Sequence, residues 1–353
     1  MRTLRIAGTK SYDILIGEGL IDACGQEIAS LFRPARLALV TDDTVHDLYG
    51  KRAIKSLTAA GFDVRRHIVP SGDRAKSPAA LMGILEFLGD NQFLKTDQLV
   101  WMGGSQLGSC AGVAASLYAQ GMYTVQIPTT IGAAINISVG GDMLINLKAG
   151  RDLIGVNATP SLVLCDTDVL SALPEPLIRD GAARMLKYAL IDHESLMAHL
   201  EKGDILDELG RNVEWCMRTK ADLTRIDKFG VSARQIVELG NVVGNAVVAC
   251  SKGKLSQGEG LAIGLLTTAR AVPKMLKNKL GCAQRVEKVL NACSLPTICP
   301  YTCGELLNAI AATKRRNEVY FTIAVPCDVG DCEVKRVTID ELGKWLIAGG
   351  VSV

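Results

Sequence analysis

A glycine turn between an apolar run and a run of small residues is the stretch of this chain best suited to chemistry. Leu99–Met102 is typical of a buried strand, Gly103, Gly104 and Gly108 follow it, and residues 111–119 suit a close-packed helix. Glycine lets a phosphate approach the backbone, and a helix start offers N–H groups and the positive end of the helix dipole. The spacing is GGxxxG and not the GxGxxG of the usual dinucleotide fingerprint, so a tight turn without a ligand explains this stretch equally well.

Strands and helices alternate through the first half of the chain and would position this turn. Apolar runs predict buried strands at 36–40, 62–69 and 99–102, after short strands at 4–7 and 12–16, and helical spacing predicts helices at 19–32, 45–60 and 77–88. This order predicts a parallel sheet, in which ligands bind beyond the carboxyl ends of the strands. Asp42, Asp73, Lys76 and the glycines all fall there, which favours a dinucleotide site.

The second half of the chain is predicted to be mainly helical. Helical spacing recurs at 176–200, 205–226, 234–250, 258–276 and 286–293, and strand signals return only at 319–325 and 333–338, on either side of Gly330. We therefore expect an α/β Rossmann-like N-terminal domain, residues 1–171, and a mainly α-helical C-terminal domain, residues 172–353.

The composition is that of an ordinary soluble globular protein. The chain has 353 residues, 48% hydrophobic and 22% charged, and its net charge of +2 gives no reason to expect nucleic acid or a membrane surface as a partner. No apolar run reaches the ~18 residues of a membrane span, and residues 1–17 lack the apolar core of a signal peptide. The 11 cysteines include no CxxC pair and fit reduced thiols. We therefore expect a cytoplasmic protein.

Long ungapped motifs show a resemblance to one family over nearly the whole chain. They are PSGDRAKS (70–77), GGSQLGSCAG (103–112), VQIPTTIGAAINISVGGDMLIN (125–146), AGRDLIG (149–155), LVLCDTDVLSALP (162–174), LKYALI (186–191) and LSQGEGLAIGL (255–265). In these motifs the chain resembles the 3-dehydroquinate synthase family of the sugar-phosphate cyclases. The resemblance implies a Rossmann-like domain that binds NAD, a helical domain that carries a catalytic divalent metal, and a homodimer.

The positions that bind NAD in the family are largely kept. The chain has the family's residue at Asp42, Lys76, Gly103, Gly104, Thr129, Thr130 and Asp168, and Asp73 stands for a glutamate. The resemblance therefore implies NAD as the cofactor.

The positions that hold the family's metal are changed. Arg184 stands where the resemblance places a glutamate ligand, and Asn241 and Gln257 stand where it places two histidines. A neutral amide is a poor zinc ligand, and a guanidinium cannot bind zinc. His193 and His199, six residues apart, are expected on different faces of one helix and not around one ion. Zinc is therefore not expected.

At the other reactive positions of the family, this chain has either a different residue or the family's own residue. The changed ones are Ser109, Asn136, Asp142, Arg151, Asp152, Glu238 and Asn245. The kept ones, which bind substrate in the family, are Lys187, Lys220, Arg234 and Asn146, and Lys314–Arg316 lie near a further basic segment. The kept cations suggest a site for a small anionic molecule, although from spacing alone solvated surface charge is the simpler explanation of lone cations.

Three functions stay open. The first is a pseudoenzyme, a dehydroquinate-synthase-like fold that binds NAD, an anionic ligand or a protein partner without synthase activity. The second is a metal-independent, NAD-dependent enzyme for a sugar-phosphate-like substrate, in which the Lys187 amine or the Cys110 thiol takes part. The third is 3-dehydroquinate synthase, the phosphate-eliminating lyase of the shikimate pathway. Replacement of all three ligand positions argues against the third, and no activated nucleophile stands at a recognisable spacing. The sequence favours the first.

Overall fold

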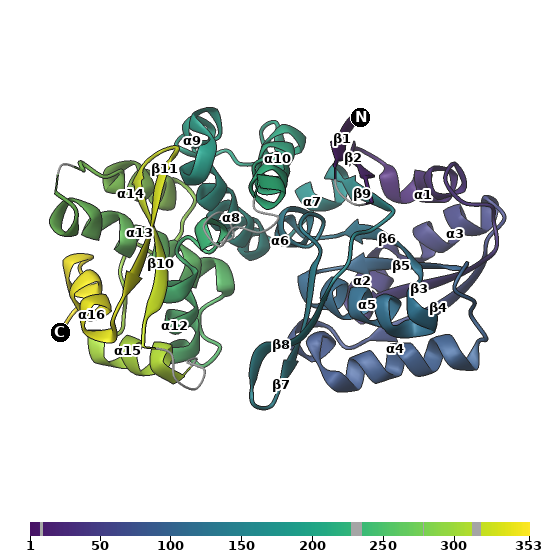
Figure 1. Ribbon diagram of the computed structural model, residues 1–353. Helices are drawn as coiled ribbons and strands as arrows, with labels where there is room; N and C mark the ends of the chain where they lie inside the picture. The colour runs from purple at the N-terminus through teal and green to yellow at the C-terminus, as the bar shows by residue number, and fades with distance from the viewer. Residues whose placement is uncertain (8–9, 227–234, 278, 313–318) are drawn as a thin grey trace. The chain divides into compact units, whose positions relative to one another are not determined.

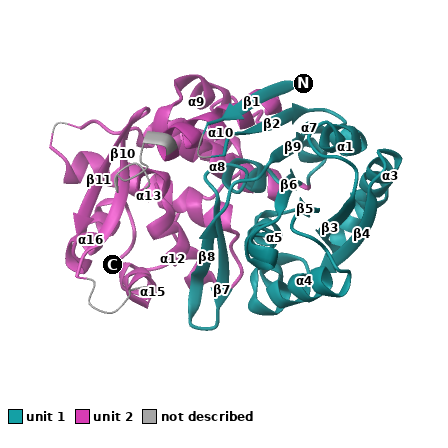
Figure 2. Cartoon of the chain, turned by 45° about the vertical axis from the view of Figure 1, so that its right-hand side comes forward, with its two compact units in different colours: residues 1–173 teal, residues 174–353 magenta. Residues whose placement is uncertain are grey.

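The computed structural model describes residues 1–7, 10–226, 235–277, 279–312 and 319–353. The chain forms two compact units, Met1–Leu173 (unit 1) and Pro174–Val353 (unit 2), coloured separately in Figure 2. Each unit has its own core.

Unit 1 is built on a seven-stranded sheet in the order β1-β2-β9-β6-β5-β3-β4 (Figure 1). The strands are β1 (Arg2–Ile6), β2 (Tyr12–Gly17), β3 (Arg36–Asp42), β4 (Asp63–Val69), β5 (Gln98–Gly103), β6 (Tyr123–Pro128) and β9 (Leu162–Asp166). Only β1 and β2 pair antiparallel, and the other pairs are parallel. The central strands are apolar on both sides because helices cover both faces. This confirms the predicted α/β Rossmann-like class of the N-terminal half.

The two faces of the sheet have separate cores. Alternate residues of β3 and β5 point to opposite sides: Leu37 and Leu39 pack with α1 (Leu20–Ala29) and α3 (Lys51–Ala59), while Ala38 and Val40 pack with α4 (Pro78–Asp90) and α5 (Ser105–Leu117). Short helical turns complete the unit, namely α2 (Asp43–Val45), η1 (His46–Gly50), η2 (Gly72–Lys76), η3 (Tyr118–Gln120), α6 (Ile131–Asn136) and α7 (Thr167–Ser171). The helix predicted over 45–60 is therefore α2, the π-helical η1 and α3 in succession.

The third glycine of the turn has a packing role. A β-carbon at Gly108 would lie only 2.8 Å from the Trp101 ring on β5. Glycine at this position therefore lets α5 lie directly on the sheet, which fixes where the helix begins.

A hairpin that the sequence did not predict extends from unit 1. It consists of β7 (Asp142–Leu147) and β8 (Gly150–Asn157), paired antiparallel. Met143 and Ile145 of β7 belong to the core that contains α4 and α5, whereas most of β8 is exposed. One strand thus anchors the hairpin and the other faces outward.

Unit 2 is mainly helical, as predicted. Its elements are α8 (Glu175–Asp192), α9 (Glu194–Leu200), α10 (Leu209–Ile226), α12 (Asn241–Ser251), α13 (Gln257–Met275), α14 (Ala283–Ala292), α15 (Cys303–Ala312), α16 (Ile339–Ala348) and the antiparallel pair β10 (Phe321–Asp328) and β11 (Asp331–Val337). Most residues of α13 are buried, and α12, α15, α16 and the hairpin pack with it around one core. The late hairpin with its turn at Gly330 is confirmed.

The prediction of one helix through both His193 and His199 is wrong. The helix breaks at His193, whose Nδ1 accepts the Leu196 N–H (3.3 Å) and caps α9. Both imidazoles approach the Trp215 ring, at 4.3 and 5.8 Å between centroids. Because they pack on one indole, they have a structural role.

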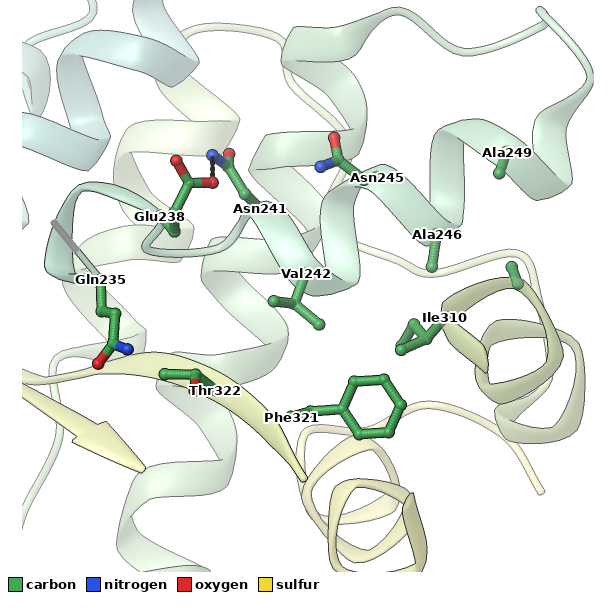
Figure 3. A pocket seen from close by; sticks show the side chains of 11 residues that line it. Gln235, Glu238, Asn241, Val242, Asn245, Ala246, Ala249, Ile310, Phe321 and Thr322 are labelled. Atoms are coloured by element: carbon green, nitrogen blue, oxygen red, sulfur yellow. Dashed lines mark hydrogen bonds between the residues drawn. The ribbon is translucent and has the colours of Figure 1, made fainter. Parts of the chain in front are cut away.

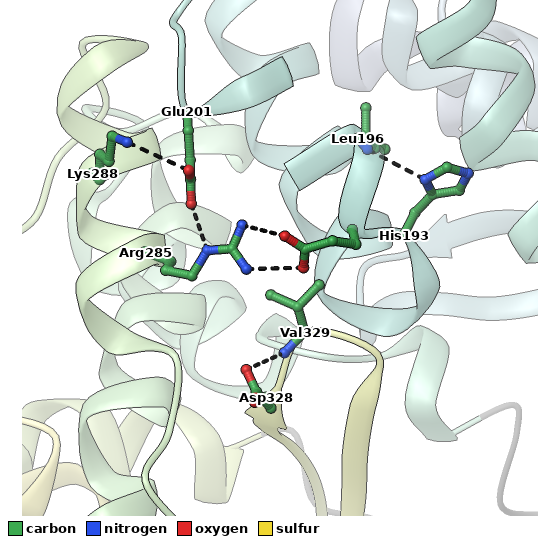
Figure 4. A network of polar contacts seen from close by, with 8 residues as sticks. His193, Leu196, Glu201, Arg285, Lys288, Asp328 and Val329 are labelled. Atoms are coloured by element: carbon green, nitrogen blue, oxygen red, sulfur yellow. Dashed lines mark hydrogen bonds and ion pairs between the residues drawn. The ribbon is translucent and has the colours of Figure 1, made fainter. Parts of the chain in front are cut away.

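Charged side chains hold α9 against α14, as Figure 4 shows. The Arg285 guanidinium donates to both carboxylate oxygens of Glu194 (2.8 and 2.9 Å) and to Glu201 (2.6 Å). These bonds keep the pKa of Glu194 below its usual range. Bidentate pairing of this kind fixes geometry as well as adding energy.

Among the described residues, no helix combines the length and the apolar character that crossing a membrane requires.

Candidate functional site

The carboxyl edge of the unit 1 sheet gathers the residues predicted to bind the cofactor. The chain leaves β3 for β4 on one side and returns to β5 on the other, so the strand order reverses between β3 and β5. Crevices at such reversals are where parallel sheets bind ligands. Asp42 and Gly103 end these two strands, and a β-carbon at Gly103 would lie 3.3 Å from Asp42 Oδ2.

Asp42 is buried at this edge, and its carboxylate also accepts a hydrogen bond from the backbone. Its Oδ1 accepts the Val45 N–H (2.8 Å) and so caps α2. Burial raises the pKa of its carboxyl group, and the bond from Val45 opposes this. Its position is therefore fixed before any ligand arrives.

The start of α5 offers hydrogen-bond donors next to an unsatisfied hydroxyl. Gly104 precedes the helix in an extended conformation, and no side chain of the described residues caps the first turn. Thr129 donates its N–H to Gly103 O (3.0 Å) at the end of β6, and its buried Oγ1 has no hydrogen-bond partner in the described chain. A buried hydroxyl without a partner is rare and calls for an explanation such as a bound group. Thr130 next to it caps α6 by accepting the Ala133 N–H (3.1 Å).

Asp168 lies at the same edge but binds the protein's own backbone. It follows β9, and its Oδ2 accepts the N–H of Gly19 (3.1 Å), the residue before α1. Gly19 has φ 69°, a left-handed conformation that favours glycine. Asp168 therefore holds the entry to α1 in this structure.

Asp73 and Lys76 lie on η2, where two residues of the β7–β8 hairpin meet them. The Lys76 ammonium forms an ion pair with Asp152, and Arg151 Nη1 lies 3.5 Å from Asp73 Oδ2. Asn146, predicted to bind substrate, accepts the Asp152 N–H at its Oδ1 (3.0 Å). The sequence did not predict these contacts.

In unit 2, Lys187 is buried in the middle of α8. Its side chain is 3% exposed, and Nζ lies 4.8 Å from the centre of the Tyr188 ring. Burial lowers the pKa of the amine to about 8, the attraction of Glu238 opposes this, and the repulsion of Arg184 adds to it. Two cations and one carboxylate therefore lie close enough to influence one another.

The starts of α12 and α13 carry Asn241 and Gln257. Asn241 Nδ2 donates to Glu238 Oε2 (2.7 Å). Gln257 lies between Ser256 and Gly258, both of which donate to Asp180 of α8. The two helix starts are therefore held at fixed positions by neighbouring carboxylates.

A pocket of about 300 Å³ opens beside α12, as Figure 3 shows. Glu238, Asn241 and Asn245 line one part of it, while Val242 and Phe321 belong to its apolar wall. Its polar part thus coincides with positions where the resemblance places reactive groups.

The remaining predicted residues fall as follows. Lys220 lies on α10, one helical turn after Cys216, which itself lies near Lys187. Arg234 and Lys314–Arg316 lie outside the described residues. Within the described ranges, no group of three or more histidine, cysteine, aspartate or glutamate side chains could hold a metal ion.

Cys110 does not have the environment of a nucleophile. It is buried in α5, and burial raises the pKa of its thiol to about 12. Reactive cysteines have lowered pKa values because the thiolate is the attacking species.

Solved structures with the same fold define the class. A 2-deoxy-scyllo-inosose synthase structure superimposes with a TM-score of 0.87 at 19% identity, covering 98% of this chain and 99% of the other. A 2-epi-5-epi-valiolone synthase from Streptomyces hygroscopicus gives 0.85 at 22% identity, with 98% and 99% covered. The fold is therefore the one shared by sugar-phosphate cyclases.

Sequence comparison then gives the family. The family profiles described as 3-dehydroquinate synthase N-terminal and C-terminal match residues 66–180 and 181–316. A 3-dehydroquinate synthase from Enterococcus faecalis is 30% identical over 344 residues, with 96% of each chain covered. The chain belongs to the 3-dehydroquinate synthase family.

Proposed function

We propose that this chain binds NAD through unit 1 and an anionic molecule through unit 2, without the metal-dependent synthase activity of its family. The observation that carries the proposal is the contrast between the two units. Within the described residues, unit 1 keeps a buried, unpaired hydroxyl beside an uncapped helix start, whereas unit 2 places a guanidinium and two amides at the expected ligand positions.

Unit 1 fits a dinucleotide. The first turn of α5 would hold the negatively charged phosphates through its N–H groups and dipole. Thr129 Oγ1 supplies a further hydrogen bond that no described residue of the chain uses. The 2-deoxy-scyllo-inosose synthase structure contains NAD+ and Co2+, and the valiolone synthase structure contains NAD+ and Zn2+. When bound, NAD supplies hydride-transfer chemistry.

Unit 2 does not fit a divalent cation. Arg184 is close enough to Lys187 to lower its pKa, so a divalent ion there would meet two positive charges. The amides of Asn241 and Gln257 are weak ligands compared with imidazole. The same cations would instead attract a carboxylate or phosphate. A homodimer, implied by the family resemblance, and a cytoplasmic location, expected from the unpaired cysteines, complete the proposal.

A calorimetric titration with NAD+, with metal content measured on the same sample, tests both halves. We expect binding near one equivalent per chain and less than stoichiometric metal, together with no formation of 3-dehydroquinate. The triple variant Arg184→Glu/Asn241→His/Gln257→His is the positive control for metal uptake. Stoichiometric zinc in the wild-type protein, or synthase turnover, would contradict the proposal.

A metal-independent enzyme is the second candidate, and Lys187 is the observation that favours it. An amine with a pKa of about 8 can both give and take a proton near neutral pH. If the metal-free protein catalyses the reduction of NAD+ by one of a set of sugar phosphates, the result would favour this second candidate over the first.

Replacing Thr129 with valine is expected to weaken NAD+ binding on the order of fivefold, as the loss of one hydrogen bond does. Because the hydroxyl has no partner in the described chain, valine should leave the free energy of unfolding unchanged or slightly higher. Thr129→Ser keeps the hydroxyl and is the matched control. Equal affinity of the valine variant and wild type would show that the hydroxyl faces no ligand.

A further inference from the structure

Where η2 contacts the β7–β8 hairpin, the carboxylate of Asp152 pairs with Lys76, a lysine proposed to bind a nucleotide. Lys76 and Asp152 form an ion pair, in which the lysine side chain is 15% exposed and the aspartate side chain 44%. Arg151 and Asp73 form a second, more exposed pair in which the signs of charge are exchanged. The hairpin is thus joined to η2 at two points.

A β-bulge aims Asp152 at Lys76. The strand register pairs Ile145 with Ile154 and Leu147 with Gly150, so one residue of β7 faces three of β8. Asp152 lies within these three and has φ 59°, in the left-handed region. Bulges redirect side chains out of the ladder, and aspartate tolerates the left-handed region better than most residues.

Asn146 and the hydrophobic core hold this bulge in place. The single β7 residue opposite the bulge is Asn146, whose side-chain oxygen accepts the Asp152 N–H at 3.0 Å. Its neighbour Ile145 lies in the same core cluster as Ala75 of η2. Since both sides of the ion pair rest on packed residues, the pairing follows from the fold.

We propose that Asp152 is an internal competitor that occupies Lys76 until an anionic group of the ligand, such as a nucleotide phosphate, displaces it. The inference rests on the proposed function, because it takes the carboxyl edge of the sheet as the nucleotide site. Exchange of one anion for another leaves no uncompensated charge on the lysine, and the half-exposed carboxylate can return to water. Asp152 therefore lowers the affinity for anionic ligands and sets their charge preference.

The test uses the full chain with Asp152→Asn, which removes the charge and keeps the shape and the backbone N–H. Asp90→Asn is the matched control, because Asp90 is an exposed carboxylate of the same unit at the end of α4, away from the hairpin and η2 residues of the ion pair. Acetylation of Lys76 by a succinimidyl ester, followed by mass spectrometry, measures the ion pair without any ligand, with exposed Lys148 as internal reference. Titration with NAD+ measures the competition.

We expect Asp152→Asn to raise both the acetylation rate of Lys76 and the affinity for NAD+ on the order of fivefold, as release of a partly exposed ion pair would. Asp90→Asn should change neither. An unchanged labelling rate, or an NAD+ affinity that does not rise in Asp152→Asn, overturns the inference. If wild type binds no NAD+ but Asp152→Asn does, the proposed function fails for the natural chain while the competition stands. If wild type and Asp152→Asn bind NAD+ equally well, the proposed function stands and the competition by Asp152 is ruled out.

Discussion

Replacing Lys187 with methionine is expected to raise the free energy of unfolding at pH 7 by about 3 kcal/mol. Lys187 is 3% exposed, and burial lowers the pKa of its amine from 10.5 to about 8. At neutral pH the amine is protonated in both states, and its protonated form is less stable in the folded chain than in the unfolded chain. Each unit by which folding lowers the pKa therefore costs about 1.4 kcal/mol of stability. Methionine fills a similar volume without charge. The pKa of about 8 already includes the opposing attraction of Glu238, so that carboxylate changes the expected gain no further.

The pH dependence of this gain identifies its cause. Because the pKa of Lys187 is lower in the folded state, the unfolded chain binds more protons between about pH 8 and 10.5, and wild-type stability rises with pH through this window. Above 10.5 the amine is neutral in both states, so the advantage of Lys187→Met should disappear. Urea unfolding of both proteins at about pH 7, 9 and 10.5 gives the difference directly, since groups distant from Lys187 titrate equally in the two.

Lys254→Met is the matched control, because Lys254 is exposed and its loss should change stability by less than about 0.5 kcal/mol. A Lys187→Met variant that is less stable than wild type would show that the ammonium supports the fold. A more stable variant would mean that the buried cation of Lys187 destabilises the fold. Side chains that bind a ligand often lower stability in this way.

The parallel sheet and the location of the cofactor residues could be predicted because both follow from local patterns. The apolar runs ending at Val40, Val69 and Met102 identify strands, and the helices between them require parallel pairing. Parallel pairing then brings Asp42, Gly103 and the residues after them to one edge, although they are distant in sequence. No side-chain contact is needed for this inference.

The hairpin and its contacts could not be predicted in the same way. The ion pair of Lys76 with Asp152 depends on a bulge that redirects one side chain. The spacing of apolar residues along a sequence does not indicate where a bulge occurs. The short apolar run Met143–Ile145, followed by Gly150, was the available strand signal. The break at His193 was hidden for a similar reason, since histidine as a helix cap has no strong sequence preference.

The positions of Asn241 and Gln257 depend on how closely α12 and α13 approach, and this contact also could not be read from spacing alone. Gly240 and Gly244 of one segment meet Gly260 and Gly264 of the other, with backbone against backbone. Four glycines allow the two helices to lie closer than side chains permit. This approach sets where α12 begins, and α12 supplies Asn241, Val242 and Asn245 to the lining of the pocket.

Replacing Gly264 with alanine is therefore expected to lower the free energy of unfolding of unit 2 by about 3 kcal/mol, at the upper end of overpacking effects. A β-carbon at residue 264 would lie 2.2 Å from the Gly240 carbonyl oxygen and 2.8 Å from the Gly244 nitrogen. Both are backbone atoms, so no side-chain rotation relieves the clash. Gly240 has φ 77°, and moving its carbonyl would disturb a left-handed conformation that precedes α12.

Gly304→Ala is the matched control for this substitution, because a β-carbon there would meet nothing within 4 Å and alanine favours a helix by about 0.5–1 kcal/mol. Amide hydrogen exchange of α12 and α13 in both variants measures the effect within unit 2. Loss of protection in Gly264→Ala alone would show that the glycine contact positions Asn241 and Gln257. Equal protection in both would mean that the helices separate without strain, and the geometry of the pocket would then tolerate larger residues at this contact.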